Sequence, residues 1–229
     1  MTITHATLTR SAAVAAIAAG LIFMGVQIGH PHSDVTAVTT TEWAVRNSFK
    51  GVMTALALAG ITGMYLRQVK QIGPLGLLGY LLFGAGYLTI MSVAFVSAYV
   101  LPTIAESDPG YVNDVLAAAT NGTAAGDIGL MQAALTVSGI TFLGGGLIFG
   151  IALYRARVLA RWASALLAVA SLLTVTLAVL PDAFYRFLAF PNAIAMIGLG
   201  YSLWLTTRTE TTTPPTGVDT PPLTAASPQ

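Results

Sequence analysis

The chain has 229 residues, of which 55% are hydrophobic and only 8% are charged, with a formal net charge of +1 and a mean hydropathy of +0.76. This composition excludes an ordinary soluble domain, in which roughly a quarter of the residues are charged. The absence of cysteine excludes a disulfide framework, a thiolate nucleophile and a cysteine-ligated metal. We therefore expect an integral membrane protein.

Six apolar runs predict an all-α fold, a polytopic bundle of transmembrane helices. The runs approach or exceed the roughly 20 residues that a helix needs to cross the hydrocarbon layer, and they lack the alternation of barrel strands. The first run follows Arg10 but precedes no small-x-small cleavage site, so we interpret it as an uncleaved span. The expected spans are Ser11 to Ile28, Phe49 to Leu66, Leu75 to Leu101, Leu130 to Tyr154, Trp162 to Leu180, and Phe187 to Leu205.

The basic residues predict that both termini lie in the cytoplasm. With that orientation the outer side holds only Arg46, Lys50 and Arg186, and the other seven of the ten basic residues are cytoplasmic. This is the bias of the positive-inside rule. We expect a multi-pass protein of the plasma membrane. Its cytoplasmic basic residues are Arg10, Arg67, Lys70, Arg155, Arg157, Arg161 and Arg208.

Outside the bundle, the sequence predicts two tails and one large loop. Residues 1–10 form a cytoplasmic tail, residues 11–206 the six-span domain, and residues 207–229 a tail with too little apolar surface to fold. The outer loop 102–129 is acidic. Its SDPG turn (Ser107 to Gly110) precedes YVNDVLAAAT, which predicts a short helix over the outer mouth of the bundle. The alternatives are a functional lid and a plain solvated connector.

Polar residues and prolines mark several helix ends. Thr39-x-x-Glu42 has the spacing of a capping box, so the second helix is expected to begin before Phe49, with Glu42 and Arg46 paired at i,i+4. Pro74 and Pro102 are expected to bracket the third span.

A face of small and polar residues runs along the fourth expected span. In lipid, helices associate through small residues that let backbones approach and through interhelical hydrogen bonds. Gln132, Thr136, Gly139, Gly146 and Gly150 recur at helical spacing. We expect this face to look inward, as a packing surface or, around Gln132, as the lining of a cavity.

The stretch GHPHSDV after the first span is a candidate metal site. Proline favours extended geometry in the residue before it, so His30, His32 and Asp34 could point the same way. Imidazole and carboxylate suit Zn²⁺ and similar ions, and Glu42, Glu106 or Asp108 could supply a further oxygen. The competing interpretation is that these residues only end the helix. The sequence requires no cofactor.

Other chemistry is poorly supported. Ionisable residues are absent from the middle of every expected span, which disfavours a proton-coupled transporter or pump. Nucleotide-binding motifs are also missing. A membrane enzyme would have to use outer-rim histidines or carboxylates, of which Glu106 and Asp182 are candidates for acid/base work.

Three phrases carry a resemblance: the HP exit of the first span; TTTEWAVRNSFK leading to GMYLRQVKQIGPLGLLGYLLF; and GGGLIFGIALYRARVLARWASALLAV. Over residues 10–206 the chain resembles small six-span integral membrane proteins of bacteria, of the actinobacterial type, whose function is uncharacterised. The resemblance implies the same layout. It transfers no catalytic motif and does not require the second histidine.

Three functions follow as hypotheses. The first is a non-enzymatic accessory, regulatory or lipid- or hydrophobe-binding membrane protein, whose partners are the bilayer and a second copy or another membrane protein, and not nucleic acid. The second is a transporter or channel for a small neutral or hydrophobic solute. It is suggested by a similarity at an offset of 90 between Gly60-Ile61 with Arg67 and Gly150-Ile151 with Arg157. The third is the outer-rim enzyme.

Overall fold

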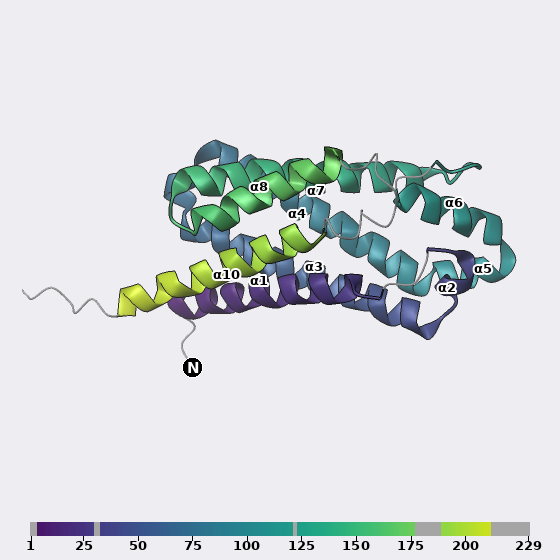
Figure 1. Cartoon of the computed structure of the whole chain (residues 1–229), viewed down its shortest axis with the longest axis horizontal. Coiled ribbons are helices and arrows are strands. Elements are labelled where there is room, and N and C mark those ends of the chain that lie inside the picture. Colours follow the sequence, from purple (N-terminus) through teal and green to yellow (C-terminus); the bar gives the residue numbers. More distant parts are fainter. Residues whose placement is uncertain (1–3, 30–32, 121–122, 177–188, 212–229) are drawn as a thin grey trace, which may run out of the picture.

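The computed structural model describes residues 4–29, 33–120, 123–176 and 189–211, and every regular element in these ranges is an α-helix. Long helices pack side by side, and short helices gather at one end, on the right of Figure 1. The all-helical prediction is confirmed for this part of the chain. The long helices are α1 (His5–Gln27), α3 (Thr41–Arg67), α4 (Val69–Tyr99), α7 (Leu130–Ala156), α8 (Arg161–Thr176) and α10 (Ala189–Thr211). The short ones are α2 (Val35–Val38), α5 (Leu101–Ser107) and α6 (Pro109–Ala119).

Four of the long helices, α1, α3, α4 and α7, are long and apolar enough to cross a membrane. The chain is therefore a membrane protein. Helix α8 carries a shorter apolar stretch, Arg161–Leu173. Residues 177–188 comprise the end of the expected fifth span, the connection after it and the start of the sixth span, and they lie outside the described residues. Those two spans and the orientation of the termini therefore stay predictions.

Both expected tails are partly helical. Helix α1 begins at His5, where the Thr4 hydroxyl accepts a hydrogen bond from the Thr7 N–H at 3.2 Å and caps the helix. Helix α10 continues to Thr211, beyond the expected end of its span. The domain boundaries at residues 10 and 207 stay predictions, and residues 212–229 lie outside the described part.

The long helices form a closed ring. Each of α1, α3, α4, α7 and α8 packs on the next in this order, α8 packs on α10, and α10 packs back on α1. Figure 1 shows α1 and α10 lying side by side, with α7 and α8 on the other side of the bundle. The first and last helices thus close the ring.

Small residues bring the backbones of α4 and α7 into contact. A Cβ atom on Gly79 would lie 2.5 Å from the backbone nitrogen of Phe149, and one on Gly86 would lie 2.6 Å from the Cα of Phe142. Real Cβ atoms do not approach other atoms so closely, so only glycine fits here. This is the close approach that stabilises helix pairs in lipid, where burying Leu against Leu gains little.

Helix α1 fits between α3 and α10 for the same reason. Its inner faces are rich in alanine, and Ala13 and Ala16 are fully buried. A Cβ atom on Gly60 of α3 would lie 2.7 Å from the Cβ of Ala16, and one on Gly200 of α10 would lie 2.8 Å from the carbonyl oxygen of Ala13. Alanine and glycine therefore set the spacing on both sides of α1.

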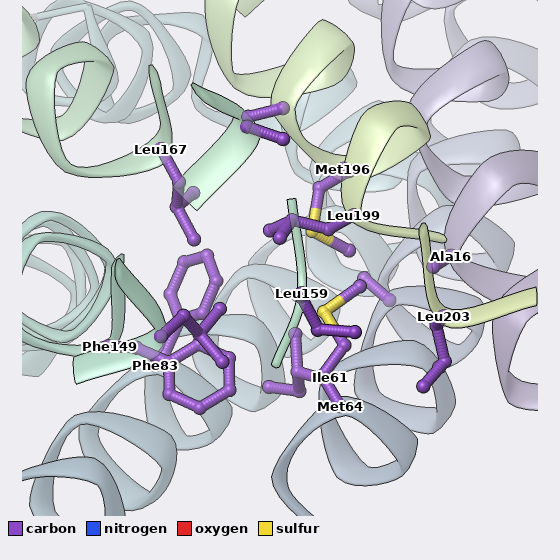
Figure 2. Close-up of a cluster of buried hydrophobic side chains, with 14 of the residues drawn as sticks. Ala16, Ile61, Met64, Phe83, Phe149, Leu159, Leu167, Met196, Leu199 and Leu203 are labelled. Atoms are coloured by element: carbon purple, nitrogen blue, oxygen red, sulfur yellow. The ribbon is translucent and has the colours of Figure 1, made fainter. Parts of the chain in front are cut away.

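Large apolar side chains fill the centre of the ring. Figure 2 shows Phe83 and Phe149 lying together, near Leu167 of α8, with Met196 and Leu199 of α10 on the other side of the centre. Each of these five side chains is at most 2% exposed. The same cluster continues through other buried side chains: Ala12, Ala13, Ala16, Ala19, Met53, Ala57, Ile61, Met64, Ile72, Tyr87, Ala152, Leu153, Leu159, Ala163, Ala195 and Leu203.

The expected limits of the third and fourth spans agree closely with α4, counted from Pro74, and with α7. Gly73 has φ +64° and ψ −172°, which interrupts α4 and lets its long segment begin at Pro74. Pro102 lies in the first turn of α5, just after α4 ends. Helix α3 begins well before Phe49, as predicted, but its N-cap is Thr40 rather than Thr39.

The charged residues separate along the bundle. At one end, which we call the basic end, Arg10 of α1 donates to the Thr207 hydroxyl at 3.2 Å and Arg67 of α3 donates to that of Thr206 at 3.3 Å. The loop after α7 reaches the same end, since the Ala160 N–H donates to the Ser202 hydroxyl at 2.8 Å. The opposite end carries α2, α5 and α6 (Figure 1). We call it the acidic end after Asp34, Glu106, Asp108 and Asp114, which lie in these helices or cap them.

Candidate functional site

The Asp34 side chain caps a helix. One carboxylate oxygen of Asp34 accepts hydrogen bonds from the Ala37 N–H at 2.8 Å and the Thr36 hydroxyl at 2.6 Å, so Asp34 is the N-cap of α2. His30 and His32 lie outside the described residues. Within the residues described, no group of three or more His, Cys, Asp or Glu side chains lies close enough to hold a metal ion. The metal site therefore stays a prediction.

The other carboxylates proposed for the outer rim have separate structural roles. Asp108 is the N-cap of α6 and accepts from the Tyr111 N–H at 3.0 Å. Glu42 pairs with Arg46 at 2.8 Å, which confirms the predicted i,i+4 pair. Glu106 is exposed, and Asp182 lies outside the described residues. The sequence signal for the Asp108 cap was the Asp-Pro pair, because proline favours the first position of a helix and aspartate the position before it.

A further carboxylate, Asp114, closes the loop between α6 and α7. Its two oxygens accept from the Ala125 N–H at 2.8 Å and the Gly126 N–H at 3.0 Å. The next acidic residue, Asp127, accepts from the Gly129 N–H at 2.8 Å just before α7 begins. Sequence reasoning missed both roles, since nothing local pairs Asp114 with residues 11 and 12 positions away.

The acidic end is a packed cap with an apolar core of its own. Trp43 is 4% exposed, and its indole N–H donates to the Ser97 carbonyl at 2.9 Å, which joins α3 to the end of α4. The loop 102–129 thus forms two helices that cover this end, as the short-helix prediction proposed, rather than a plain solvated connector. The buried members of this second cluster are Ala37, Val38, Trp43, Leu101, Ala105, Val112, Val115, Leu116 and Ile128.

The predicted face of α7 is divided into two halves. Gly146 and Gly150 are buried, and a Cβ atom on Gly150 would lie 2.7 Å from the backbone nitrogen of Ala168 in α8. Gln132, Thr136 and Gly139 are exposed instead. The expectation that the whole face looks inward is corrected for this half. Helix α4 packs against a different side of α7, the side that carries Phe142, Gly145 and Phe149.

An aromatic cluster lies between α4 and α7. The rings of Phe83 and Tyr87 are 4.7 Å apart, and Phe142 lies 5.2 Å from each of them. Tyr80 stacks on Tyr65 of α3 at 4.7 Å. The spacing of three and four residues between Tyr80, Phe83 and Tyr87 in α4 signals this stripe. Its rings rigidify the contact between helices and add a modest stabilisation beyond their burial.

Comparisons with protein-family models, with curated proteins and with solved structures find no match to the chain. The resemblance to small bacterial six-span proteins therefore stays a prediction.

Proposed function

We propose that this membrane protein acts without catalysis, by lateral contact in the bilayer with another membrane protein or a second copy of itself. The observation that carries the proposal is the filled centre of the ring. Phe149 and Leu199 are fully buried there, and Phe83 is 1% exposed. An interior packed with apolar side chains leaves function to the outer surfaces, and it argues against a solute path along the axis.

The exposed half of α7 is the contact surface that the geometry supports best. We call it the α7 surface: Gln132, Thr136 and Gly139, flanked by the exposed apolar residues Val137 and Ile140. A Cβ atom on Gly139 would meet no other atom within 4 Å, so a partner's backbone can approach there. The Gln132 amide, near the N-terminal end of α7, can donate and accept hydrogen bonds across such a contact.

Photo-crosslinking tests this surface. The chain has no cysteine, so each introduced cysteine is the only site that a thiol reagent can label. Gly139→Cys is labelled with a benzophenone maleimide and illuminated in native membranes. Leu88→Cys on α4 is the matched control, since Leu88 is 51% exposed and lies at a similar depth, close to the contact of Gly86 with Phe142. We expect a discrete protein adduct at position 139 and only lipid adducts at position 88. Lipid adducts alone at both positions would overturn the proposal.

A further inference from the structure

A hollow opens at the basic end, where α7 turns into α8. The turn itself lies on the left of Figure 1. It has a volume of about 440 Å³ and is lined by Tyr154, Arg155, Arg157 and Arg161. Three of its four lining residues are arginines. Among the side chains that the structure describes, no carboxylate forms an ion pair with Arg155, Arg157 or Arg161. The hollow therefore presents three guanidinium groups whose charge no such ion pair neutralises.

Arg157 adopts a backbone conformation that normally belongs to glycine. It ends α7 with φ 58° and ψ 22°, and its N–H donates to the Leu153 carbonyl at 3.3 Å. Within the described ranges it is the only residue other than glycine with a positive φ. Glycine would satisfy this helix end without strain, so an arginine at position 157 runs against the backbone preference. Such strain is a pointer to function.

Arg161 is held in place by an aromatic ring. Its guanidinium carbon lies 4.3 Å from the centre of the Tyr154 ring, a cation–π contact. Guanidinium donors fit phosphate oxygens two at a time. The hollow thus offers a fixed donor group beside two further arginines.

The surroundings of the hollow are those of a membrane interface. Trp162, directly after Arg161, is 59% exposed, and tryptophan concentrates at the level of lipid headgroups. Ile151 and Tyr154 are 40% and 38% exposed, and they lie on one side of α7 at a spacing of three residues. Apolar surface therefore leads from the arginines along α7 toward the hydrocarbon layer.

We propose that this hollow binds the phosphate of an anionic phospholipid, with its headgroup at Arg155, Arg157 and Arg161 and an acyl chain along Ile151 and Tyr154. Positive charge at this end would by itself be enough to orient the protein in the membrane. The strained backbone of Arg157 and the contact of Arg161 with the Tyr154 ring add a defined geometry, which the orientation of the protein does not require. The site is separate from the α7 surface, so neither proposal depends on the other.

Native mass spectrometry of the whole chain released from nanodiscs tests the proposal. The nanodiscs contain equal parts of phosphatidylglycerol and phosphatidylcholine, and a parallel sample in phosphatidylcholine alone receives inorganic phosphate. The variants are Arg157→Gly and Arg161→Gln. Arg157→Gly relieves the backbone strain, so it is expected to fold at least as well as the parent chain. Arg10→Gln is the control, because it removes one positive charge at the same end of the bundle, on α1, which is not among the neighbours of α7 in the ring.

We expect phosphatidylglycerol to be retained preferentially, with its retention reduced about tenfold in Arg157→Gly and in Arg161→Gln and unchanged in Arg10→Gln. Equal retention of the two lipids would overturn the proposal, as would equal losses in all three variants, which would indicate a diffuse charge effect. If inorganic phosphate binds in the parallel sample while the two lipids are retained equally, the ligand is a soluble phosphate and the lipid assignment fails.

Discussion

Gly79 of α4 lies directly against the backbone of Phe149 of α7, so that a Cβ atom on Gly79 would fall 2.5 Å from the Phe149 nitrogen and 2.7 Å from its Cα. A backbone cannot withdraw as a flexible side chain can. The contact therefore fixes how closely α4 and α7 pack, and with it the position of the aromatic cluster between them.

Gly79→Ala is expected to destabilise the bundle by about 1–3 kcal/mol, the usual cost of overpacking a close contact. Gly144→Ala is the matched control in α7, since a Cβ atom there would meet nothing within 4 Å. The control should leave stability unchanged or raise it by up to about 1 kcal/mol, because alanine favours helix over glycine. Thermal unfolding in detergent measures both variants. Equal stability of the two would contradict the contact.

Trp43 is predicted to hold the cap at the acidic end onto the bundle. Trp43→Phe keeps most of the packing but loses the hydrogen bond to the Ser97 carbonyl, and should cost about 1 kcal/mol. Trp43→Ala also leaves a cavity and should cost about 3–5 kcal/mol. Limited proteolysis in the loop after α6, alongside thermal unfolding, reads out both changes. If Trp43→Ala cost no more than Trp43→Phe, the second apolar cluster would not support the cap.

Arg46 should contribute more to stability than its partner Glu42. Its guanidinium donates to the carbonyls of Val26 at 3.3 Å and Ile28 at 2.9 Å, which satisfies the end of α1. Arg46→Ala should therefore cost about 1.5–3 kcal/mol. Glu42→Gln should cost less than about 0.5 kcal/mol, because the carboxylate side chain is 57% exposed and surface pairs contribute little. Chemical denaturation compares them, and a larger loss for Glu42→Gln would reverse the assignment.

Asp114 is predicted to order the loop before α7. Asp114→Ala removes both acceptors of the Ala125 and Gly126 N–H groups. Amide hydrogen exchange at these two positions should then accelerate about tenfold, as expected for the loss of about 1.4 kcal/mol of local stability. Asp114→Asn keeps one acceptor oxygen and should show an intermediate rate. Unchanged exchange in Asp114→Ala would show that other contacts order the loop.

The limits of a helix were predictable where proline determines them. Pro74 marked the start of the long segment of α4, and Pro102 marked the first turn after α4 ends, because proline interrupts helices for local reasons. The cap of α3 was predicted one residue early, at Thr39 instead of Thr40, because two adjacent threonines offer the same hydroxyl. Local rules alone do not separate such neighbours.

The orientation of α7 was not predictable in the same way. In a membrane helix, apolar residues face lipid and neighbouring helices alike, so polarity does not say which face is inside. Gly150 is buried because α8 packs there, whereas Gly139 of the same stripe is exposed. The order of helices around the ring decides this, and that order depends on contacts distant in sequence.

The candidate sites also divide into features that local sequence can predict and features that depend on contacts distant in sequence. Asp34 was predicted as a metal ligand, which stays a prediction, and one of its oxygens accepts hydrogen bonds from the Ala37 N–H and the Thr36 hydroxyl. A carboxylate after a helix end serves either purpose, and the one-dimensional pattern does not distinguish them. The hollow around Arg157 could not be predicted from the sequence, because it depends on the left-handed backbone of Arg157 and on the contact of Arg161 with Tyr154.

Substituted-cysteine accessibility along the ring axis tests the central claim, a filled interior with function at the surface. Ile61→Cys, Phe149→Cys and Leu199→Cys lie at fully buried positions, and Leu130→Cys, at an 88% exposed position at the start of α7, is the reference. In sealed membranes with a charged thiosulfonate reagent, we predict reaction at position 130 and none at the three axial positions. Reaction at the axial positions would show a water-filled path through the ring and contradict the account.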